Sequence, residues 1–373
     1  MKILHSFDRI KPFNQLPLLP PIKDIIDKDI LYKWGLASRA LAELNKNILR
    51  LPNPSMLINT IGLQEAKSST EIENIFTTED ELYKAISSTL NETSATPNVK
   101  EVLRCREALW EGYSNITKKG KIDTKTIIKI YQQVKNTKEG IRSPQSQVVI
   151  KRGNSQLRAG EIIYTPPRGK GIVEQKLNNL IEYLNNDKKN TLDPLLKMAI
   201  AHYQFEAIHP FMDGNGRTGR ILNLLYLVNQ GLISHPILYL SKYIIENKDA
   251  YYRNLEIVTQ RNSWKNWLLF MLTAVEETSK KTNATIDSII NQMQATLDYV
   301  KPELKWYNKE INEAIFSQPY LKPKHIQVIL YRSSRTTLTK YMMQLVELKI
   351  ILPKKDGKEV FYINTDLVRI LSD

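Results

Sequence analysis

The sequence contains one cysteine, five histidines and no long apolar run among its 373 residues. The single Cys105 excludes an internal disulfide, and no cysteine cluster exists for a structural zinc site. This cysteine usage is typical of a reducing compartment. The N-terminus, Met1–Asp8, lacks the apolar stretch of a signal peptide, and no later segment reads as a membrane span. We therefore expect a cytoplasmic protein that does not enter a membrane.

Acidic residues are outnumbered, with 39 of them against 53 lysines and arginines, which gives a formal net charge of +14. Such an excess favours anionic partners, such as nucleotides or nucleic acid. An AT-biased genome would produce the same Lys-, Asn- and Ile-rich composition, so the charge alone decides nothing. The length suits two or three domains of an ordinary globular protein.

Strand-like patterning is scarce before the C-terminus. Prolines make residues 1–28 extended, and from about Ile30 apolar residues recur at helical steps of three and four. Only residues 147–164 differ, because Val148–Ile150 and Ile162–Tyr164 flank the polar loop Arg152–Ser155. We call this predicted hairpin the flap. Its edge could pair with the main chain of a protein substrate, although many hairpins have no such role.

The last 70 or so residues follow a different pattern. Helices are predicted near Trp306–Phe316, Lys324–Tyr331 and Ser334–Leu348, followed by strands at Ile350–Leu352 and Val360–Ile363. Helix, turn, helix and a two-stranded wing is the order of a winged helix-turn-helix. Such a unit serves either DNA binding or protein contacts and dimerisation. The basic residues suited to a nucleic-acid backbone are Arg332, Arg335, Lys340, Lys354, Lys355 and Lys358.

The chemistry is concentrated in the stretch His209–Arg220. It holds a histidine, an aspartate, three glycines, an asparagine and two arginines between two apolar helical segments. Glycines allow a close backbone approach, a helix starting after them directs free N–H groups at an anion, and arginine binds phosphate in a bidentate manner. Histidine moves protons near neutral pH. The stretch therefore predicts a phosphate site with a base beside it.

Two neighbouring features have alternative interpretations. His202, Glu206 and His209 share a helix face and have metal-ligand chemistry, but helix packing is favoured, because the glycines and arginines after them indicate phosphate. Further along the chain, Tyr251 or Tyr252 could stack on a nucleotide base, although such tyrosines more often belong to the core.

The segment 65–75 is unusual for a helix because three hydroxyl residues, at positions 68–70, sit together in mid-pattern. Asn74 suits a left-handed C-terminal cap, which places Glu73 in the last turn. An acid there opposes the helix dipole, so helix stability does not explain Glu73. A solvated surface glutamate is the ordinary alternative.

The stretch His209–Arg220 resembles the Fic family motif HPFx(D/E)GNGRxxR at every fixed position. Residues 69–74 are similar to the family's inhibitory motif (S/T)xxxE(G/N), with Ser69, Glu73 and Asn74 at its fixed positions. The proline-rich start, the flap and the C-terminal pattern are similar to a common bacterial architecture. The resemblance implies a mainly α fold. Its expected parts are an N-terminal helical region, 1–110, with the inhibitory helix at about 60–78; a Fic core, 111–290, with flap 147–164; and a winged helix-turn-helix, 300–373.

The resemblance also implies an activity, the transfer of AMP from ATP to a Tyr, Thr or Ser hydroxyl of a protein. His209 would then be the general base and Asp213 would hold Mg²⁺, while the Asn215 amide would meet a phosphate oxygen. The nucleotide-binding set implied by the motif, with the two tyrosines added from their position, is Gly214, Asn215, Gly216, Arg217, Gly219, Arg220, Tyr251 and Tyr252.

Glu73 would restrain this activity by pairing with Arg220 and blocking the γ-phosphate position, which predicts autoinhibition within one chain. The protein substrate would dock at the flap, and the C-terminal unit is the candidate for DNA binding. Two alternative functions stay open: a nucleotide-sensing transcriptional regulator without transfer activity, and an enzyme that removes AMP. The sequence leaves the oligomeric state open, a homodimer included.

Overall fold

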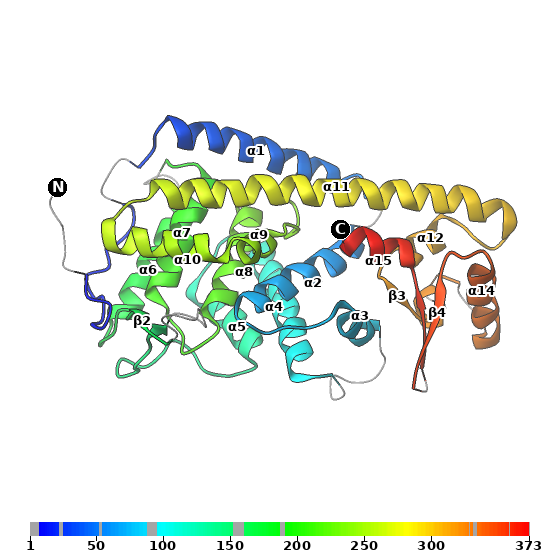
Figure 1. Cartoon of the computed structure of the whole chain (residues 1–373), viewed down its shortest axis with the longest axis horizontal. Helices are drawn as coiled ribbons and strands as arrows, with labels where there is room; N and C mark the ends of the chain where they lie inside the picture. The colour runs from blue at the N-terminus through cyan, green and yellow to red at the C-terminus, as the bar shows by residue number, and fades with distance from the viewer. Residues whose placement is uncertain are drawn as a thin grey trace.

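The structure, a computed structural model of the chain, describes residues 7–21, 25–51, 54–87, 95–151, 160–186, 191–327, 329–330, 334–357 and 359–372. The side chains of residues 54–59 and of Arg335 are outside this description. Of the predicted features, the flap loop Arg152–Ser155 and the basic residues Arg332 and Lys358 lie outside the described residues. The described chain is mainly helical with a few short strands, as predicted (Figure 1). In the described ranges no helix combines the length and apolar character needed to cross a bilayer.

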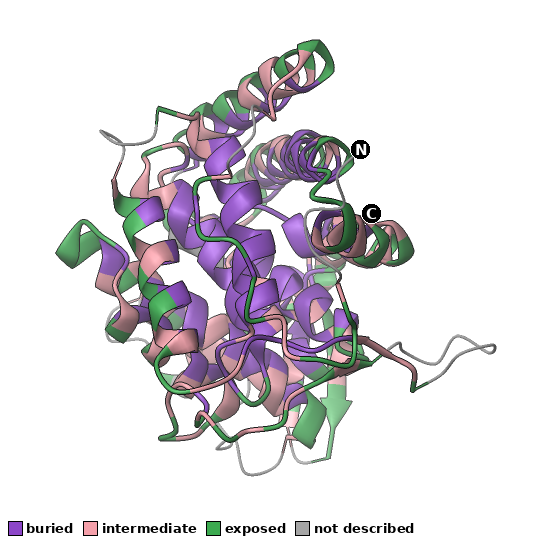
Figure 2. Ribbon diagram, turned by 90° about the vertical axis from the view of Figure 1, so that its left-hand side faces the viewer, coloured by how far each residue is buried: buried purple, intermediate pink, exposed green. Residues whose placement is uncertain are grey.

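Two helices form the centre of the larger part of the molecule, which precedes the C-terminal unit. Helix α7 (Pro194–Ile208) is buried on nearly all sides, as expected for a helix that is apolar all round. Helix α8 (Asn215–Asn229) packs beside it, and the loop between them carries the motif. Figure 2 shows these central helices as the most buried part of the molecule. The helices around them are α4 (Pro97–Lys119), α5 (Thr124–Lys135), α6 (Ile172–Asn185), α9 (Leu240–Glu246) and α10 (Lys248–Arg261).

A long pair of helices runs along one side of the molecule (Figure 1). Helix α1 (Lys28–Ile48) lies parallel to α11 (Lys265–Glu303), because Lys33 Nζ lies 3.0 Å from Glu276 Oε2 and Asn47 Nδ2 lies 3.1 Å from Asp287 Oδ1. Helix α11 has 39 residues, about 58 Å at 1.5 Å per residue. Helix α11 therefore connects the larger part of the molecule to the C-terminal unit.

Helix α2 (Pro54–Ile72) continues unbroken through the segment whose hydroxyl residues looked unfavourable. Ser68, Ser69 and Thr70 are buried, and the Thr70 hydroxyl donates to Lys67 O at 2.8 Å. Burial against α4 and α9 favours the helix more than its local propensity suggests. Asn74 has φ 62°, the left-handed conformation expected of a C-terminal cap.

The flap is a hairpin, as predicted; its second strand has the predicted bounds, whereas its first strand begins later than the pattern suggested. Strand β1 (Ile150–Lys151) pairs antiparallel with β2 (Ile162–Tyr164), so Val148 and Val149 precede the strand. The extended N-terminal segment lies against this hairpin. Phe13 N donates to Thr165 O at 3.0 Å, and Phe7 stacks on the Tyr164 ring.

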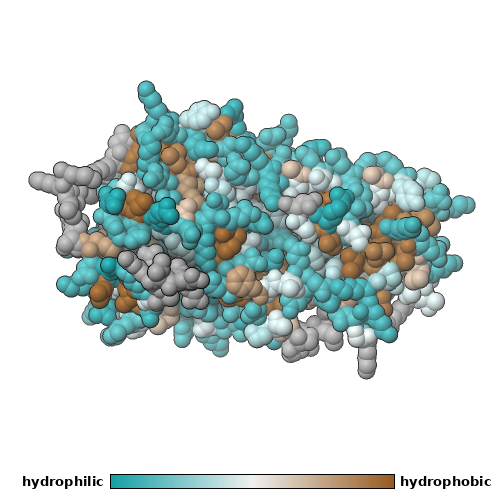
Figure 3. Space-filling model, in the orientation of Figure 1, coloured by the Kyte–Doolittle hydropathy of each residue, from teal (hydrophilic) through white to brown (hydrophobic). Residues whose placement is uncertain are grey.

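The C-terminal unit contains α12 (Lys309–Ile315), α13 (Pro323–Gln327), α14 (Arg335–Glu347) and α15 (Thr365–Ser372) around a three-stranded sheet. The sheet order is β3 (Tyr320–Leu321), β5 (Glu359–Ile363), β4 (Leu352–Asp356). The elements follow the predicted order, with β3 and α15 in addition. The unit contacts α3 (Glu79–Ser87), where Tyr320 and Lys354 both bond Asp80 Oδ1 at 2.6 Å. Three exposed apolar side chains belong to this unit: Met343, Leu352 and Val360. Hydrophobic surface is visible toward the right-hand end of the molecule in Figure 3.

Candidate active site

The loop between α7 and α8 is shaped by two left-handed residues. His209 ends α7 with φ 50°, and its N–H donates to Phe205 O at 3.0 Å. Gly214 precedes α8 with φ 73°, a conformation that costs glycine little. Between them the Asn215 amide bridges the Phe211 backbone, since it accepts from Phe211 N and donates to Phe211 O at 2.9 Å each. The loop is therefore held rigidly over the start of α8.

Asn215 and Gly219 have packing contacts in addition to their predicted roles. Both amide atoms of the Asn215 side chain are bonded to Phe211, so this side chain shapes the loop, and its contact with a phosphate oxygen stays a prediction. Gly219 faces α7 rather than the phosphate site. A Cβ atom there would come within 2.7 Å of Glu206 Oε1 and 2.9 Å of Phe205 Cδ1. Its role is close packing of α7 and α8.

The N-terminus of α8 is the candidate anion cradle, because the first N–H groups of a helix point toward a bound anion. Gly216 lies close to Glu73 and Arg220. An added Cβ atom at Gly216 would collide with the Glu73 carboxylate and lie 2.9 Å from Arg220 Nη1. Gly214 lies beside Lys135, whose Cγ and Cδ atoms would be 3.0 Å from an added Cβ atom. Any larger residue at either position would narrow the space for a phosphate.

His209 presents its imidazole to the cavity beside the cradle. Its Nδ1 lies 3.3 Å from Glu206 O, and its own carbonyl accepts from Arg142 Nε at 2.8 Å. Burial lowers the pKa of the His209 imidazole from 6.5 to about 4. Because the lowered pKa favours the neutral ring, His209 can accept a proton throughout the neutral pH range.

The ring resonances of His209 should therefore stay unchanged between about pH 8 and about pH 6, where an ordinary histidine titrates. NMR of the imidazole carbon-bound protons would measure this, with the signal assigned by its loss in His209→Ala. The expected midpoint is near pH 4. A midpoint near the ordinary value would mean that the ring is not desolvated in solution.

Arg220 is bonded to the end of α2 through its Nε and Nη2 groups. Its Nη2 lies 2.7 Å from Glu73 Oε1 and 2.8 Å from Ser69 O, and its Nε donates to Ser69 Oγ at 2.9 Å. Burial alone would raise the pKa of Glu73, but the charge of Arg220 outweighs it and lowers that pKa. Lys248 holds the same helix end, because its Nζ donates to Ile72 O at 2.6 Å. Ser69, Glu73 and Arg220 thus form one polar cluster, in which Ser69 and Arg220 are buried and the Glu73 side chain is 35% exposed.

Arg217, the other motif arginine, is buried and forms an ion pair with Glu101 of α4. Among the residues with described positions, its Nε has no hydrogen-bond partner. The guanidinium therefore keeps one donor free at the side of the cradle.

Asp213 is the carboxylate of the motif loop. It is exposed, and its Oδ2 lies 2.5 Å from Lys135 Nζ. Although burial opposes it, the hydrogen bonds from Lys135 and from Gly214 N lower the pKa of Asp213. No cluster of three or more acidic, histidine or cysteine ligands occurs among the described side chains. Magnesium fits this arrangement, because Mg²⁺ is usually bound by one or two carboxylates together with substrate phosphates.

A cavity of about 160 Å³ lies between the motif loop and the flap. Its polar wall contains Glu73, His209 and Arg220, and Ile163 and Tyr164 of β2 line the other side. The two predicted tyrosines also border it, but differently: Tyr251 is 2% exposed, whereas Tyr252 is 36% exposed. Tyr252 alone of this pair has a ring face free to stack.

His202 does not belong to a metal site in this structure. Its Nε2 lies 2.8 Å from the Tyr251 hydroxyl, and its ring stacks on Trp267 in the core. Burial lowers the pKa of His202 to about 3, as expected of a neutral packing residue. The packing interpretation of His202 fits this geometry. Tyr251 is correspondingly a core residue that reaches the cavity only with its edge.

Four side chains that hold the site were given no site role from the sequence: Glu101, Lys135, Arg142 and Lys248. Arg142 donates to the carbonyls of Pro167, Ile208 and His209, so it connects the flap end to the motif loop. Each of the four contacts a partner more than 60 residues away, and no local spacing announces such a pair.

Three known families match successive parts of the chain. Residues 31–114 match the family described as Fic/DOC family N-terminal, and residues 121–227 match the Fic/DOC family. Residues 292–367 match the family described as protein adenylyltransferase SoFic-like, C-terminal domain. The three matches together cover more than two thirds of the chain.

Curated relatives are similar over smaller parts. The protein adenylyltransferase fic-1 of Caenorhabditis elegans is 30% identical over 137 residues, which are 37% of this chain and 24% of that protein. A probable protein adenylyltransferase of Aquifex aeolicus is 31% identical over 189 residues, 50% of this chain and 54% of that protein. The chain thus spans between a quarter and about half the length of these relatives.

Solved structures share the fold. A Fic family protein from Desulfovibrio desulfuricans superposes with a TM-score of 0.58 at 21% identity, covering 92% of this chain and 98% of that one. Residues 134–508 of Fic-1 from C. elegans give 0.52 at 17% identity, covering 68% of this chain and 71% of that one. At these identities the likeness concerns the fold.

Proposed function

This chain belongs to the Fic/DOC family, and on that premise we propose that it transfers AMP from ATP to a hydroxyl group of a protein, itself included. The observation that carries the proposal is a neutral imidazole beside an anion cradle with two buried arginines. The names of the C. elegans and A. aeolicus relatives describe the same activity.

In the proposed reaction the hydroxyl oxygen of the target attacks the α-phosphorus of ATP. His209 takes the hydroxyl proton, a new P–O bond forms, and the bond to the pyrophosphate oxygen breaks. The N–H groups at the start of α8 and the guanidinium of Arg217 bind the negative phosphates. Asp213 would hold Mg²⁺, which supplies charge neutralisation on the phosphates when bound.

We propose that Glu73 restrains this reaction. Arg220 is the natural clamp for the terminal phosphate, yet Glu73 and Ser69 already occupy its donors. The Glu73 carboxylate also lies against Gly216, where it would repel an entering phosphate. ATP would then bind with its α-phosphorus poorly placed for attack, and positioning accounts for much of such a rate.

The flap is the proposed docking place of the protein substrate. Among the described strands β1 has only β2 as a neighbour, so its outer edge can accept an extended chain, and residues of both strands line the His209 cavity. Main-chain pairing there would bring a target hydroxyl to His209 without requiring a specific sequence.

Magnesium dependence tests the role of Asp213. In a Glu73→Gly background, Asp213→Asn should raise the Mg²⁺ concentration for half-maximal AMP transfer at least about tenfold, because the single anionic ligand becomes neutral. Initial rates over a magnesium titration measure this. Asp298→Asn, at an exposed acid of α11, is the matched control and should change nothing. Equal magnesium curves for both variants would remove Asp213 from the metal site.

Labelling with ATP carrying a radioactive α-phosphate tests the activity itself. Transfer of label to protein in Glu73→Gly is the expected result. Absence of any label, combined with salt-dependent binding of a DNA duplex by the C-terminal unit, would instead favour a nucleotide-sensing regulator. Loss of AMP from a pre-labelled protein, without net transfer, would favour the reverse reaction.

A further inference from the structure

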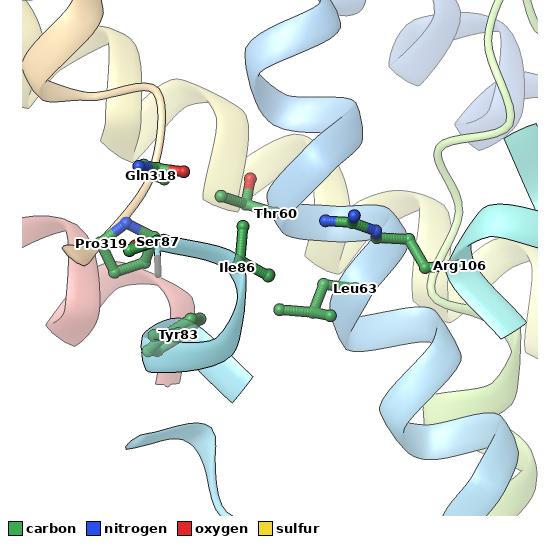
Figure 4. Close-up of a pocket in the computed structure, with 8 residues that line it drawn as sticks. All are labelled: Thr60, Leu63, Tyr83, Ile86, Ser87, Arg106, Gln318 and Pro319. Atoms are coloured by element: carbon green, nitrogen blue, oxygen red, sulfur yellow. The ribbon is translucent and has the colours of Figure 1, made fainter. Parts of the chain in front are cut away.

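A second cavity of about 190 Å³ lies apart from His209, where α2, α3 and α4 meet the chain just before β3 (Figure 4). Leu63 of α2, Ile86 of α3 and Pro319 form its apolar walls. Gln318 and Arg106 contribute the polar groups, and no acidic residue lines it among the described side chains. The cavity is large enough for several water molecules or a small organic molecule.

Arg106 is the unusual member of this cavity. It reaches from α4 toward Thr60 and Leu63, as Figure 4 shows, with most of its side chain buried. Within the described ranges its Nε is buried without a hydrogen-bond partner, and the guanidinium forms no ion pair. A guanidinium stays charged in proteins, and buried charges are normally paired and hydrogen-bonded. The cavity thus contains a guanidinium whose Nε donor has no partner among the described residues.

The nearby acids are engaged elsewhere. Glu107, the next residue of α4, accepts from Gln133 Nε2 at 2.9 Å. On α3, Asp80 bonds Lys84, Lys354 and Tyr320. Glu107 acts on Arg106 through its charge, but no hydrogen bond joins the two among the described side chains, so a ligand with oxyanion chemistry would complete the hydrogen bonds of Arg106.

The hydroxyl groups around the cavity are also satisfied. Ser87 Oγ donates to Tyr320 O, and the Tyr83 hydroxyl accepts from Gln64 Nε2 at 2.8 Å. Arg106 is thus the main free donor, and the remaining surface is largely apolar. This combination selects one charged group on a short apolar body rather than a polyanion such as ATP.

We propose that this cavity binds a small organic anion, with its carboxylate or phosphate group on Arg106 and its apolar part against Leu63, Ile86 and Pro319. The bound anion would contact α2, α3, α4 and the segment before β3 at once. It would therefore join the helix that carries Glu73 to the C-terminal unit. The proposal concerns a site separate from the nucleotide cavity and does not depend on AMP transfer.

Isothermal titration of the full chain with butyrate and with ethyl phosphate tests the proposal. One saturable site is expected for at least one of the two probes, and the preferred probe identifies the charged group. Arg106→Gln should weaken that binding at least tenfold. Arg104→Gln is the matched control, because residues two positions apart on a helix face different directions, and it should bind like the wild type.

A second variant keeps the test decisive if Arg106→Gln does not fold. Ile86→Trp should fill the cavity and abolish binding while Arg106 is kept, with folding checked by thermal unfolding. Anion binding at the nucleotide cradle would be unaffected by either variant. The proposal is overturned if neither probe shows saturable binding to the wild type, or if the folded variants bind as tightly as the wild type.

Discussion

Replacing Glu73 with glycine is expected to raise the initial rate of AMP transfer about 10- to 100-fold. The substitution removes the charge-assisted hydrogen bond between Glu73 Oε1 and Arg220 Nη2, and hydrogen bonds to charged groups contribute about 1.5–3 kcal/mol. Each 1.4 kcal/mol corresponds to about a tenfold change in an equilibrium or rate. The measured quantity is radioactive AMP incorporated into protein per unit time under saturating Mg-ATP.

The control for this variant is Glu71→Gly. Glu71 lies two residues earlier on α2 and interacts with Lys67 at 3.6 Å, away from Arg220. The change introduces the same glycine and removes the same charge, so it separates loss of the Arg220 contact from general loosening of the helix end. Equal activation by both variants would show that helix stability, and not the Glu73 carboxylate, sets the restraint.

His209→Ala in the Glu73→Gly background should reduce the transfer rate by about 10²- to 10⁴-fold, the usual contribution of a general base. Nucleotide binding should persist, since the cradle and both arginines are intact. Single-turnover rates and nucleotide titration measure the two properties separately.

His235→Ala is the matched histidine control. Its imidazole is half-buried beside Tyr113 and Ser234, and it does not line the His209 cavity. We expect a rate close to that of Glu73→Gly alone. If the His209 variant retained the rate of its parent, another group would have to take the hydroxyl proton.

Local features of the site were predictable from the sequence. The loop His209–Gly214, the helix after it and the left-handed Asn74 all depend on residues within a few positions of one another. The motif also identified Arg220 and Glu73 as a pair, and they lie 2.7 Å apart. That pairing came from the family resemblance, because no pattern within this chain relates residues 147 positions apart.

The functions of individual motif residues were less predictable. Asn215 and Gly219 occupy motif positions. The contacts of the Asn215 side chain, however, depend on Phe211, and the space beside Gly219 depends on the neighbouring helix α7. Ion pairs such as Arg217 with Glu101 are formed by helix packing, which a one-dimensional pattern does not contain. Spacing therefore predicts which residues meet on one helix, and packing decides what they touch.

Short elements were missed for a similar reason. Strand β3 has two residues, and its pairing with β5 exists only because the C-terminal unit is folded. The first flap strand, β1, also has two residues and begins later than its pattern suggested, whereas β2 has the predicted bounds. The long helix α1 was evident because its periodicity extends over many turns.

Intact-protein mass spectrometry after incubation with Mg-ATP tests the central claim most directly, namely that His209 transfers AMP and that the Glu73–Arg220 contact restrains it. The account predicts that Glu73→Gly gains the mass of one or more AMP groups on hydroxyl side chains. Wild type should gain far less, and the double variant with His209→Ala should gain none. Glu73→Gly that binds ATP and keeps its original mass, alone and with candidate protein substrates, would contradict the account.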